Sequence, residues 1–404
     1  MSEEKLVPKL RFSGFDDEWI IKKLNDVSDV NPKTRELPEK FVYIDLDCVN
    51  HGILTKFNQI NKNEAPSRAQ RCLNVNDILF QTVRPYQMNN LFFELYDGEY
   101  VASTGYAQIK SKIVPKFLYY YLHYNKFVNE VLNRCTGTSY PTINSNDLKK
   151  IKIKIPPSSN EQMLIGDLFY KLDQKIELLK DKYHYYQEFK KYLMQQIFTQ
   201  KLRFNINSSY SNYKLKDIVT KFSTGLNPRK NFKLNEGGEN YYVTIKNFQN
   251  GKLNLDSKCD KINDNALKLI NKRSDLQKDD LIFASIGRVG EVYLIKNNPK
   301  NWNINESVFS LRPDKRFILP KFLYYLLSSN KIQYYFKSNI TGSTFKSIKM
   351  KDLKNTPVTI PDNIELQIEI IDFLTIIDLK IDNLKNELDN LIKFKSGLLQ
   401  QMFI

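Results

Sequence analysis

The segment Lys116-Phe117-Leu118-Tyr119-Tyr120 recurs 205 residues later as Lys321-Phe322-Leu323-Tyr324-Tyr325, and this repeat decides the fold. The offset continues without a gap, and 30 of the 84 residue pairs between 116–199 and 321–404 are identical. Self-similarity at a fixed offset is the signature of a duplicated architecture. The sequence therefore predicts two related halves, each a variable block followed by a helical segment.

The boundaries of these parts follow two isoleucine–proline junctions, Ile155-Pro156 and Ile360-Pro361. We predict a first globular domain over residues 1–155, a central helical spacer over 156–204, a second globular domain over 205–360 and a distal C-terminal helical spacer over 361–404. Upstream of the repeat the halves align more loosely. Each variable block begins like the end of the preceding helix, because Lys9-Leu10-Arg11-Phe12 recurs as Lys201-Leu202-Arg203-Phe204. The predicted layout is nearly circular, with a pseudo-two-fold relation between the halves.

A long helical pattern follows each junction. Its apolar residues alternate spacings of four and three, which is the pattern of a coiled-coil seam, and Lys190 and Lys395 interrupt the seam at matching places. Because phase and interruption coincide, we predict an antiparallel pair of roughly 50–60 Å that holds two domains apart; the alternative is two helices that each pack on their own domain. The seam residues are Leu172, Ile176, Leu179, Leu193 and Ile197 in the first helix, and Ile377, Ile381, Leu384, Leu388, Leu391 and Leu398 in the second.

The variable blocks read as α+β. Short β-like runs separated by Gly, Asn, Asp and Pro are followed in each block by one Tyr-rich amphipathic helix, over 115–132 and 320–337. The order of elements is shared while the sequences differ most here, which is what two readers of different DNA sequences would need. The β-like runs are 41–44, 78–80, 241–245, 281–283 and 292–295.

Positive charge is concentrated in one part of the chain. The 404 residues carry a net charge of +16. Residues 1–155 contribute +4, 156–204 contribute +2, 205–360 contribute +14 and 361–404 contribute −4. A basic excess favours a polyanionic partner. We therefore expect nucleic acid on the first and third segments, with binding to the third more sensitive to salt.

Composition excludes several classes of protein. Hydrophobic residues make up 41% of the chain, enough to form cores and too many for a disordered chain. No stretch approaches the roughly 18–20 uncharged apolar residues of a membrane span, and the N-terminus lacks the apolar region of a signal peptide. The four cysteines are too scattered for a disulfide framework. We expect a cytoplasmic protein that contacts no membrane.

No motif predicts catalysis or a bound cofactor. The chain has no GxxxxGK[ST] phosphate loop and no GxGxxG segment. It also lacks the Asn-Pro-Pro-aromatic and Asp-Pro-Pro-Tyr segments of base-flipping amino-methyltransferases, because Pro156-Pro157 precedes Ser158. Cys48 and His51 are spaced like half of a zinc site, but a second ligand pair is missing, so we predict no metal site.

Polar loop residues are the candidates for reading DNA. Arg and Lys bond guanine edges, Asn and Gln bond adenine edges, and Ser and Thr bond either, while other side chains touch only phosphate. For any one of them a solvated loop position remains the alternative, and Tyr140 and Phe345 could equally be core residues. The candidates are Arg84, Thr136, Thr138, Ser139, Tyr140, Asn144, Arg229, Lys230, Lys246, Asn247, Ser285, Arg288, Thr344, Lys346 and Lys349.

These features resemble the specificity subunit of Type I restriction-modification systems. The resemblance covers essentially the whole chain, and the doubled layout is its most specific part. One departure is Leu366, which stands where the first copy has Glu161. The motifs that carry the resemblance are Pro8–Phe15 with Trp19 and Leu24, Ser103–Ala107, Glu306–Pro313, the Thr-Gly turns followed by Asp-Leu and Ile-Pro, Glu161-Gln162, and Gly397–Phe403.

The resemblance implies a non-catalytic DNA-specificity protein. Residues 1–155 and 205–360 would be target recognition domains for the two halves of a bipartite, asymmetric double-stranded DNA target, and the helices would set the gap between the halves. The helices would also dock two methyltransferase subunits, which bind S-adenosylmethionine and methylate adenine; restriction (translocase and nuclease) subunits, using ATP and Mg²⁺, would join that core. Rival hypotheses are an enzyme with degenerate motifs, a coiled-coil adaptor and a non-specific nucleic-acid binder.

Overall fold

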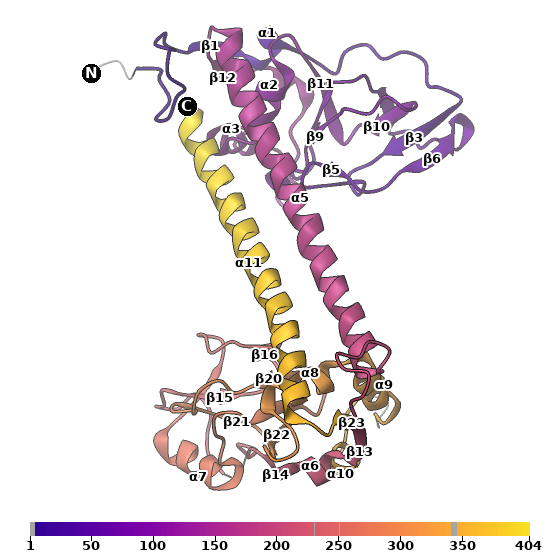
Figure 1. Cartoon of the computed structure of the whole chain (residues 1–404). Helices are drawn as coiled ribbons and strands as arrows, with labels where there is room; N and C mark the ends of the chain where they lie inside the picture. Colours follow the sequence, from indigo (N-terminus) through magenta and orange to yellow (C-terminus); the bar gives the residue numbers. More distant parts are fainter. Residues whose placement is uncertain (1–4, 230, 250, 341–345) are drawn as a thin grey trace. The chain divides into compact units, whose positions relative to one another are not determined.

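The computed structural model describes residues 5–229, 231–249, 251–340 and 346–404. The chain divides into two compact units (Figure 1): the first comprises Met1–Asp181 with Asn386–Ile404, and the second comprises Lys182–Lys385. Two long helices, α5 (Ser159–Phe198) and α11 (Ile364–Met402), each contribute residues to both units. None of the described helices is long and apolar enough to cross a membrane.

The first unit contains two four-stranded sheets, with the orders β6-β3-β10-β7 and β2-β11-β8-β9. The N-terminal strand β1 pairs with β12, so the chain closes the unit just before α5 begins. The strands are β1 (Ile20–Lys23), β2 (Ser28–Val30), β3 (Lys40–Ile44), β4 (Val49–Asn50), β5 (Ile53–Leu54), β6 (Asn58–Asn61), β7 (Ala69–Cys72), β8 (Ile78–Gln81), β9 (Leu91–Phe92), β10 (Tyr100–Ser103), β11 (Tyr106–Ser111) and β12 (Lys152–Ile155).

The main core of the first unit is aromatic. Phe403, near the end of α11, is 1% exposed and stacks on Phe169 of α5, while Trp19 packs edge-on against Phe403 and Phe117. Both ends of the chain are thereby held in this unit, as the circular layout predicts. Its helices besides the long ones are α1 (Leu24–Val27), α2 (Pro115–Tyr121), α3 (Asn125–Leu132) and α4 (Ser145–Lys149), with short 3-10 turns η1 (Lys62–Glu64) and η2 (Pro85–Gln87).

The second unit repeats this plan. Its four-stranded sheet has the order β14-β22-β19-β20, its second sheet the order β18-β15-β21, and β13 pairs with β23 before α11. Each unit contains one sheet with a parallel pair, β3 with β10 in the first unit and β15 with β21 in the second. The strands are β13 (Tyr210–Lys214), β14 (Val219–Thr224), β15 (Asn240–Val243), β16 (Phe248–Gln249), β17 (Lys252–Leu253), β18 (Asp260–Ile262), β19 (Leu281–Ala284), β20 (Val292–Leu294), β21 (Trp302–Ile304), β22 (Val308–Pro313) and β23 (Pro357–Pro361).

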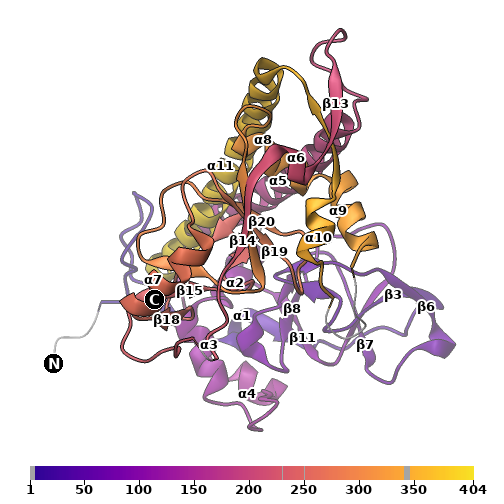
Figure 2. The ribbon, with the colours of Figure 1, turned by 90° about the horizontal axis from the view of Figure 1, so that it is seen from below.

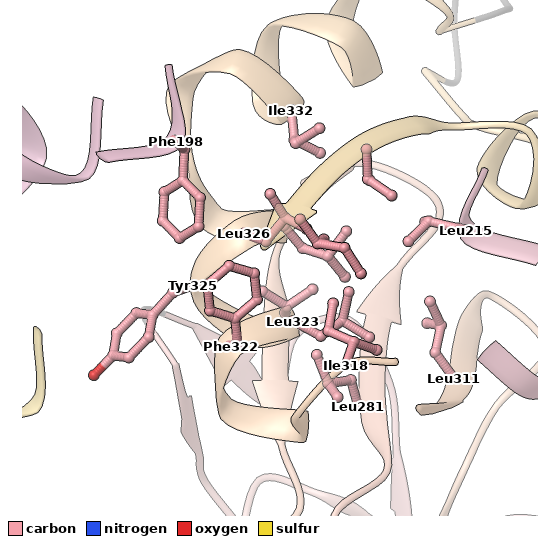
Figure 3. Packing of buried hydrophobic residues seen from close by; sticks show 14 of the residues in the cluster. Phe198, Leu215, Leu281, Leu311, Ile318, Phe322, Leu323, Tyr325, Leu326 and Ile332 are labelled. Atoms are coloured by element: carbon pink, nitrogen blue, oxygen red, sulfur yellow. The ribbon is translucent and has the colours of Figure 1, made fainter. Parts of the chain in front are cut away.

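The core of the second unit lies between its helices and the β14–β22–β19–β20 sheet. Figure 3 shows Phe322, Leu323 and Leu326 of one helix facing Leu281 and Leu311 of the sheet, with Phe198 of α5 joining the cluster. In Figure 2, α7 and α9 lie on opposite sides of the central strands β14, β19 and β20. The helices are α6 (Leu215–Ile218), α7 (Asp264–Ser274), α8 (Pro320–Ser328), α9 (Asn330–Ser338) and α10 (Met350–Lys354).

The structure corrects the predicted Tyr-rich helices. Each is two helices, because Tyr124 and Ser329 take extended backbone conformations at the start of α3 and α9. The amphipathic spacing runs through both breaks, so periodicity alone does not show them. The sequence did not lead us to predict helix α7. Its signals were Asn263, whose Oδ1 accepts a hydrogen bond from Ala266 N at 2.9 Å and caps the helix, and apolar residues that follow with helical spacing. It packs against β21, whereas β7 flanks the equivalent strand β10 in the first unit.

The seam residues point inward. Within the first unit Leu172 and Leu398 join one hydrophobic cluster, and within the second unit Leu193, Ile197 and Ile377 join another. In the first unit the helix segments run antiparallel, because Phe169 meets Phe403 while Asp173 meets Lys395. In the second unit Lys190 of α5 meets Asp378 of α11, and Phe204, beyond the end of α5, packs against Phe373 of α11. Buried seam residues are Ile176, Leu179, Leu193, Ile197, Ile377 and Leu384; half-buried ones are Leu172, Ile381, Leu388, Leu391 and Leu398.

Candidate nucleic-acid interface

A polar cleft of about 550 Å³ opens in the first unit where β8 ends. Three segments form its walls: residues 46–55 around β4 and β5, the end of β8 with the loop that follows it, and Tyr140 of a second loop that runs from Thr136 to Thr142. The second loop is closed by paired Thr136 and Thr142 backbone hydrogen bonds of 3.0 and 2.9 Å. The lining residues are Leu46, Asp47, Val49, Asn50, Thr55, Gln81, Val83, Arg84, Gln87, Asn89 and Tyr140.

Arg84 and Tyr140, both predicted candidates, meet at the mouth of this cleft. The guanidinium carbon of Arg84 lies 4.3 Å from the centroid of the Tyr140 ring, in a cation–π arrangement. Tyr140 is 62% exposed, so it is not a core residue. Arg84 has a φ of 55°, a left-handed conformation that costs an arginine about 1 kcal/mol or more. A side chain held against such a cost is a candidate for function.

The remaining candidates of the first unit lie on or next to the same loops. Some have exposed side chains, and others form hydrogen bonds that stabilise the local structure. Thr136 closes the loop, and Thr138 and Ser139 are exposed beside Tyr140. Gly137 supports the turn, because its φ is 89° and a Cβ there would lie 3.1 Å from Tyr140 O. Asn144 instead caps α4, where its Oδ1 accepts a hydrogen bond from Asp147 N at 2.9 Å.

Sequence reasoning missed three amides in the cleft, Asn50, Gln87 and Asn89. Buried Gln81 positions Gln87 and Asn89, because it donates to Val83 O and Gln87 Oε1 at 2.8 Å each and accepts from Asn89 N at 3.1 Å. The run Gln87-Met88-Asn89-Asn90 directly after Arg84-Pro85 was the available signal. Amide groups beside an arginine form a set of donors and acceptors suited to base edges.

The second unit uses the same backbone with different side chains. Ile143 N donates to Thr82 O in the first unit and Ile348 N to Ser285 O in the second; likewise Arg84 N donates to Pro141 O and Gly287 N to Lys346 O. Arg84 and Gly287 are therefore equivalent, and both have positive φ, 55° and 70°. The equivalent loop position thus carries an arginine side chain in one unit and a bare glycine in the other.

Several candidates of the second unit serve its structure. Ser285 is buried and its Oγ donates to Ser307 O at 2.7 Å. The guanidinium of Arg288 donates to Phe248 O at 3.1 Å and to Ile245 O, which holds two loops together. Asn247 Oδ1 accepts from Thr244 N at 2.8 Å and stabilises a turn.

The exposed candidates of the second unit are cationic. Arg229, Lys246, Lys346 and Lys349 are all exposed, and within the described residues their charged groups make no hydrogen bond or ion pair. Lys230 and Thr344, with Phe345, lie outside the described residues. The free cations suit phosphate contacts.

Cys48, next to the lining residue Val49, is not a reactive thiolate. Cys48 is buried beside lining residue Val49, and burial raises the pKa of its thiol. His51 is exposed, and no group of three His, Cys, Asp or Glu side chains in the described part of the chain could hold a metal ion.

Comparisons with known proteins identify relatives of this chain. The family model described as "Type I restriction modification DNA specificity domain" matches residues 16–195 and 207–393. The Type I restriction enzyme EcoBI specificity subunit of Escherichia coli is 28% identical over 131 residues, 32% of this chain and 27% of that protein. The putative type I restriction enzyme MjaX specificity subunit of Methanocaldococcus jannaschii is 25% identical over 417 residues, 98% of this chain and 95% of that protein.

Solved structures share the fold. A chain from a study of complex assembly and conformational transition of the type I R-M system has a TM-score of 0.60 at 19% identity, with 95% of this chain and 97% of that chain covered. The Type-I restriction-modification system S subunit from M. genitalium has a TM-score of 0.58 at 18% identity, covering 98% and 99%. The match to the E. coli protein spans about a quarter of that protein's length.

Proposed function

The chain belongs to the family of Type I restriction modification DNA specificity proteins, and from this premise we propose that its two units read the two halves of a bipartite, asymmetric double-stranded DNA target. The observation that carries the proposal is the loop pair at Arg84 and Gly287. One scaffold, repeated, presents an arginine with amides in one unit and a glycine among lysines in the other. Two readers built this way would recognise different bases with the same backbone.

The proposed roles of the units differ. In the first, Arg84 and the cleft amides would contact base edges, because arginine suits guanine and amides suit adenine. In the second, Lys246, Lys346 and Lys349 would contact phosphates and position the duplex. The +14 charge of residues 205–360 supports this division.

The proposed role of α5 and α11 is to set the gap between the half-sites and to dock two methyltransferase subunits. Large apolar side chains exposed on these helices support docking: Leu178 on α5 is 70% exposed, and Ile376 and Leu379 on α11 are 67% and 57% exposed. The docked subunits would bind S-adenosylmethionine and methylate adenine. Restriction subunits, using ATP and Mg²⁺, would add cleavage, and the complex would act in the cytoplasm.

Methylome sequencing tests the function directly. The chain is expressed with its modification subunits in a host without DNA methylation, and methylated adenines are mapped. We expect one bipartite motif with a constant gap. Methylation without sequence preference would refute the specificity role, and cleavage or methylation by the purified chain alone would favour an enzyme.

A domain exchange tests the division of labour. Replacing residues 205–355 with the equivalent block of another family member should change only one half of the motif. The unaltered half serves as the internal control. A change in both halves would contradict independent reading by the two units.

A further inference from the structure

The two lysines that interrupt the helical seam occupy equivalent ion pairs. In the first unit, Lys395 of α11 pairs with Asp173 of α5, and Tyr120 Oη of α2 donates to Asp173 Oδ2 at 2.8 Å. In the second unit, Lys190 of α5 pairs with Asp378 of α11 at 2.6 Å, and Tyr325 Oη of α8 donates to Asp378 Oδ2 at 2.6 Å. We name Tyr120, Asp173 and Lys395 the first triad, and Tyr325, Asp378 and Lys190 the second triad.

The triads match in their details. Lys395 Nζ lies 5.3 Å from the ring centroid of Tyr120, and Lys190 Nζ lies 5.4 Å from that of Tyr325. The side chains of Lys395 and Lys190 are 24% and 22% exposed, and those of their aspartates 35% and 31%. All three positions are identities of the 205-residue repeat, so the arrangement occurs twice.

Each triad joins three elements: a helix of the globular part, the long helix that follows it, and the opposite long helix. Figure 3 shows Tyr325 with its ring at the edge of the hydrophobic cluster and its hydroxyl pointing away from the other labelled side chains. Burial, together with the nearby aspartate, raises the pKa of both tyrosines, so each hydroxyl remains a proton donor.

Apolar seams leave the register of two helices weakly defined. A 4-3 pattern repeats every seven residues, so similar packing recurs after a slip of about 10 Å. A polar residue in the seam that requires a partner at one position excludes such slips, at a cost in stability. Lys190 and Lys395 meet this condition, since each has its carboxylate at one position of the facing helix.

We propose that the two Tyr–Asp–Lys triads are positioning residues, which lock α5 against α11 in one register and hold each recognition fold to the helix pair. This rests on the proposed function, because register would then determine the gap between half-sites. The triads would act through geometry, without touching DNA.

The test replaces both lysines by methionine, Lys190→Met with Lys395→Met, in the full chain with its modification subunits. The matched control is Lys191→Met with Lys393→Met, at exposed neighbouring positions outside the seam. We expect methylation at gaps other than the native one to rise about tenfold relative to native sites. Both half-sites should stay unchanged, and the thermal midpoint should fall slightly, because Asp173 and Asp378 lose their cationic partners.

A purely structural role gives a different result: a lower thermal midpoint with an unchanged gap, and the unchanged gap overturns the proposal. If the methionine variant methylates nothing, a second variant with both ion pairs reversed tests the proposal. This variant carries Lys190→Asp with Asp378→Lys, and Lys395→Asp with Asp173→Lys. Recovery of the native gap supports the triads, and failure to recover overturns them. If the wild-type complex shows no bipartite motif, the proposed function has failed instead.

A measurement on the purified chain is independent of DNA. Spin labels at exposed His184 of α5 and Lys380 of α11, both in the second unit, report the register of the two helices. The unsubstituted chain should give one distance, and the double methionine variant a second population or a broadened one. A single unchanged distance would overturn the proposal.

Discussion

A buried ion pair explains why one half carries Glu161 where the other carries Leu366. Glu161 is fully buried and accepts two hydrogen bonds from Arg11, at 2.7 and 2.9 Å, and one from Trp19 Nε1 at 3.3 Å. The hydrogen bond that Arg11 donates to Glu161 raises the pKa of Arg11. In the second half the equivalent arginine, Arg203, is exposed, so Leu366 can join the core instead.

Breaking this ion pair should destabilise the first unit. Glu161→Gln leaves Arg11 with an uncompensated charge, and we expect unfolding free energy to fall by about 3 kcal/mol. Trp19 fluorescence during urea unfolding, in a Trp302→Phe background, reports the first unit alone because the chain has two tryptophans. The double variant Arg11→Met, Glu161→Leu should recover much of the loss. Equal losses in the single and double variants would contradict this account.

Replacing Arg84 by glycine should relieve backbone strain and reduce sequence specificity. Arg84→Gly removes the left-handed strain and reproduces the glycine of the second unit, so stability should be unchanged or rise by up to about 1 kcal/mol. Specificity at one base of one half-site should relax. Met88→Gly is the matched control, since Met88 also has positive φ, 52°, and does not line the cleft. Methylome sequencing of both variants checks this; unchanged specificity in Arg84→Gly would exclude Arg84 from base reading.

His123 should make the first unit sensitive to acid. Burial lowers its pKa from 6.5 to about 4, and its neutral ring contacts Tyr119 O at 2.8 Å. As the pH falls, His123 is protonated in the unfolded chain before it is protonated in the folded chain. The stabilisation that the neutral ring contributes is therefore fully present above pH 6.5 and is lost as the pH falls towards 4. The loss should reach about 3 kcal/mol. Unfolding at several pH values, followed by Trp19 fluorescence, should show a shallower pH dependence in His123→Gln, and an equal dependence would contradict the assignment.

At the scale of elements, periodicity predicted more than loop chemistry did. The five predicted β-like runs all overlap strands, although 241–245 and 292–295 extend past the ends of β15 and β20. The 4-3 pattern located both long helices. Both signals arise from residues that are near one another in sequence. The break at Tyr124 and the roles of Ser285 and Arg288 could not be predicted this way. Each depends on a partner far along the chain, such as Phe403 for Tyr124, Ser307 for Ser285 and Phe248 for Arg288.

Lengthening both long helices should change the gap by a defined amount. Seven residues inserted after Asp181 and seven after Lys385 fall at the boundaries of the two units and leave both triads intact. Seven helical residues add about 10 Å, which corresponds to about three base pairs at 3.4 Å each. Methylome sequencing should show unchanged half-sites with a gap about three base pairs longer. The same insertion in α5 alone should abolish methylation, and a native gap in the doubly lengthened chain would refute the spacer role.

At the scale of the whole molecule, net charge is divided unevenly between the halves. Residues 205–360 carry +14 and residues 1–155 carry +4, while the cleft with its arginine and amides lies in the first unit. Net charge could be read from the sequence, since it needs no coordinates. That Lys246, Lys346 and Lys349 have no ion-pair partner among the described residues could not be read from the sequence. Lysines elsewhere in the same unit are paired, as Lys221 is with Asp275.

The uneven charge predicts an uneven salt dependence of DNA binding. Each phosphate contact that is lost lowers the slope of log affinity against log salt by about 0.9. The triple variant Lys246→Gln, Lys346→Gln, Lys349→Gln should therefore flatten the slope of the complex by up to about 3 without altering the methylated motif. Lys268→Gln, Lys272→Gln, Lys278→Gln removes the same charge from exposed positions elsewhere in the unit. If both triple variants flatten the slope equally, binding follows net charge alone and the three loop lysines have no special role. A clearly larger effect of the first triple variant would assign the phosphate contacts to Lys246, Lys346 and Lys349.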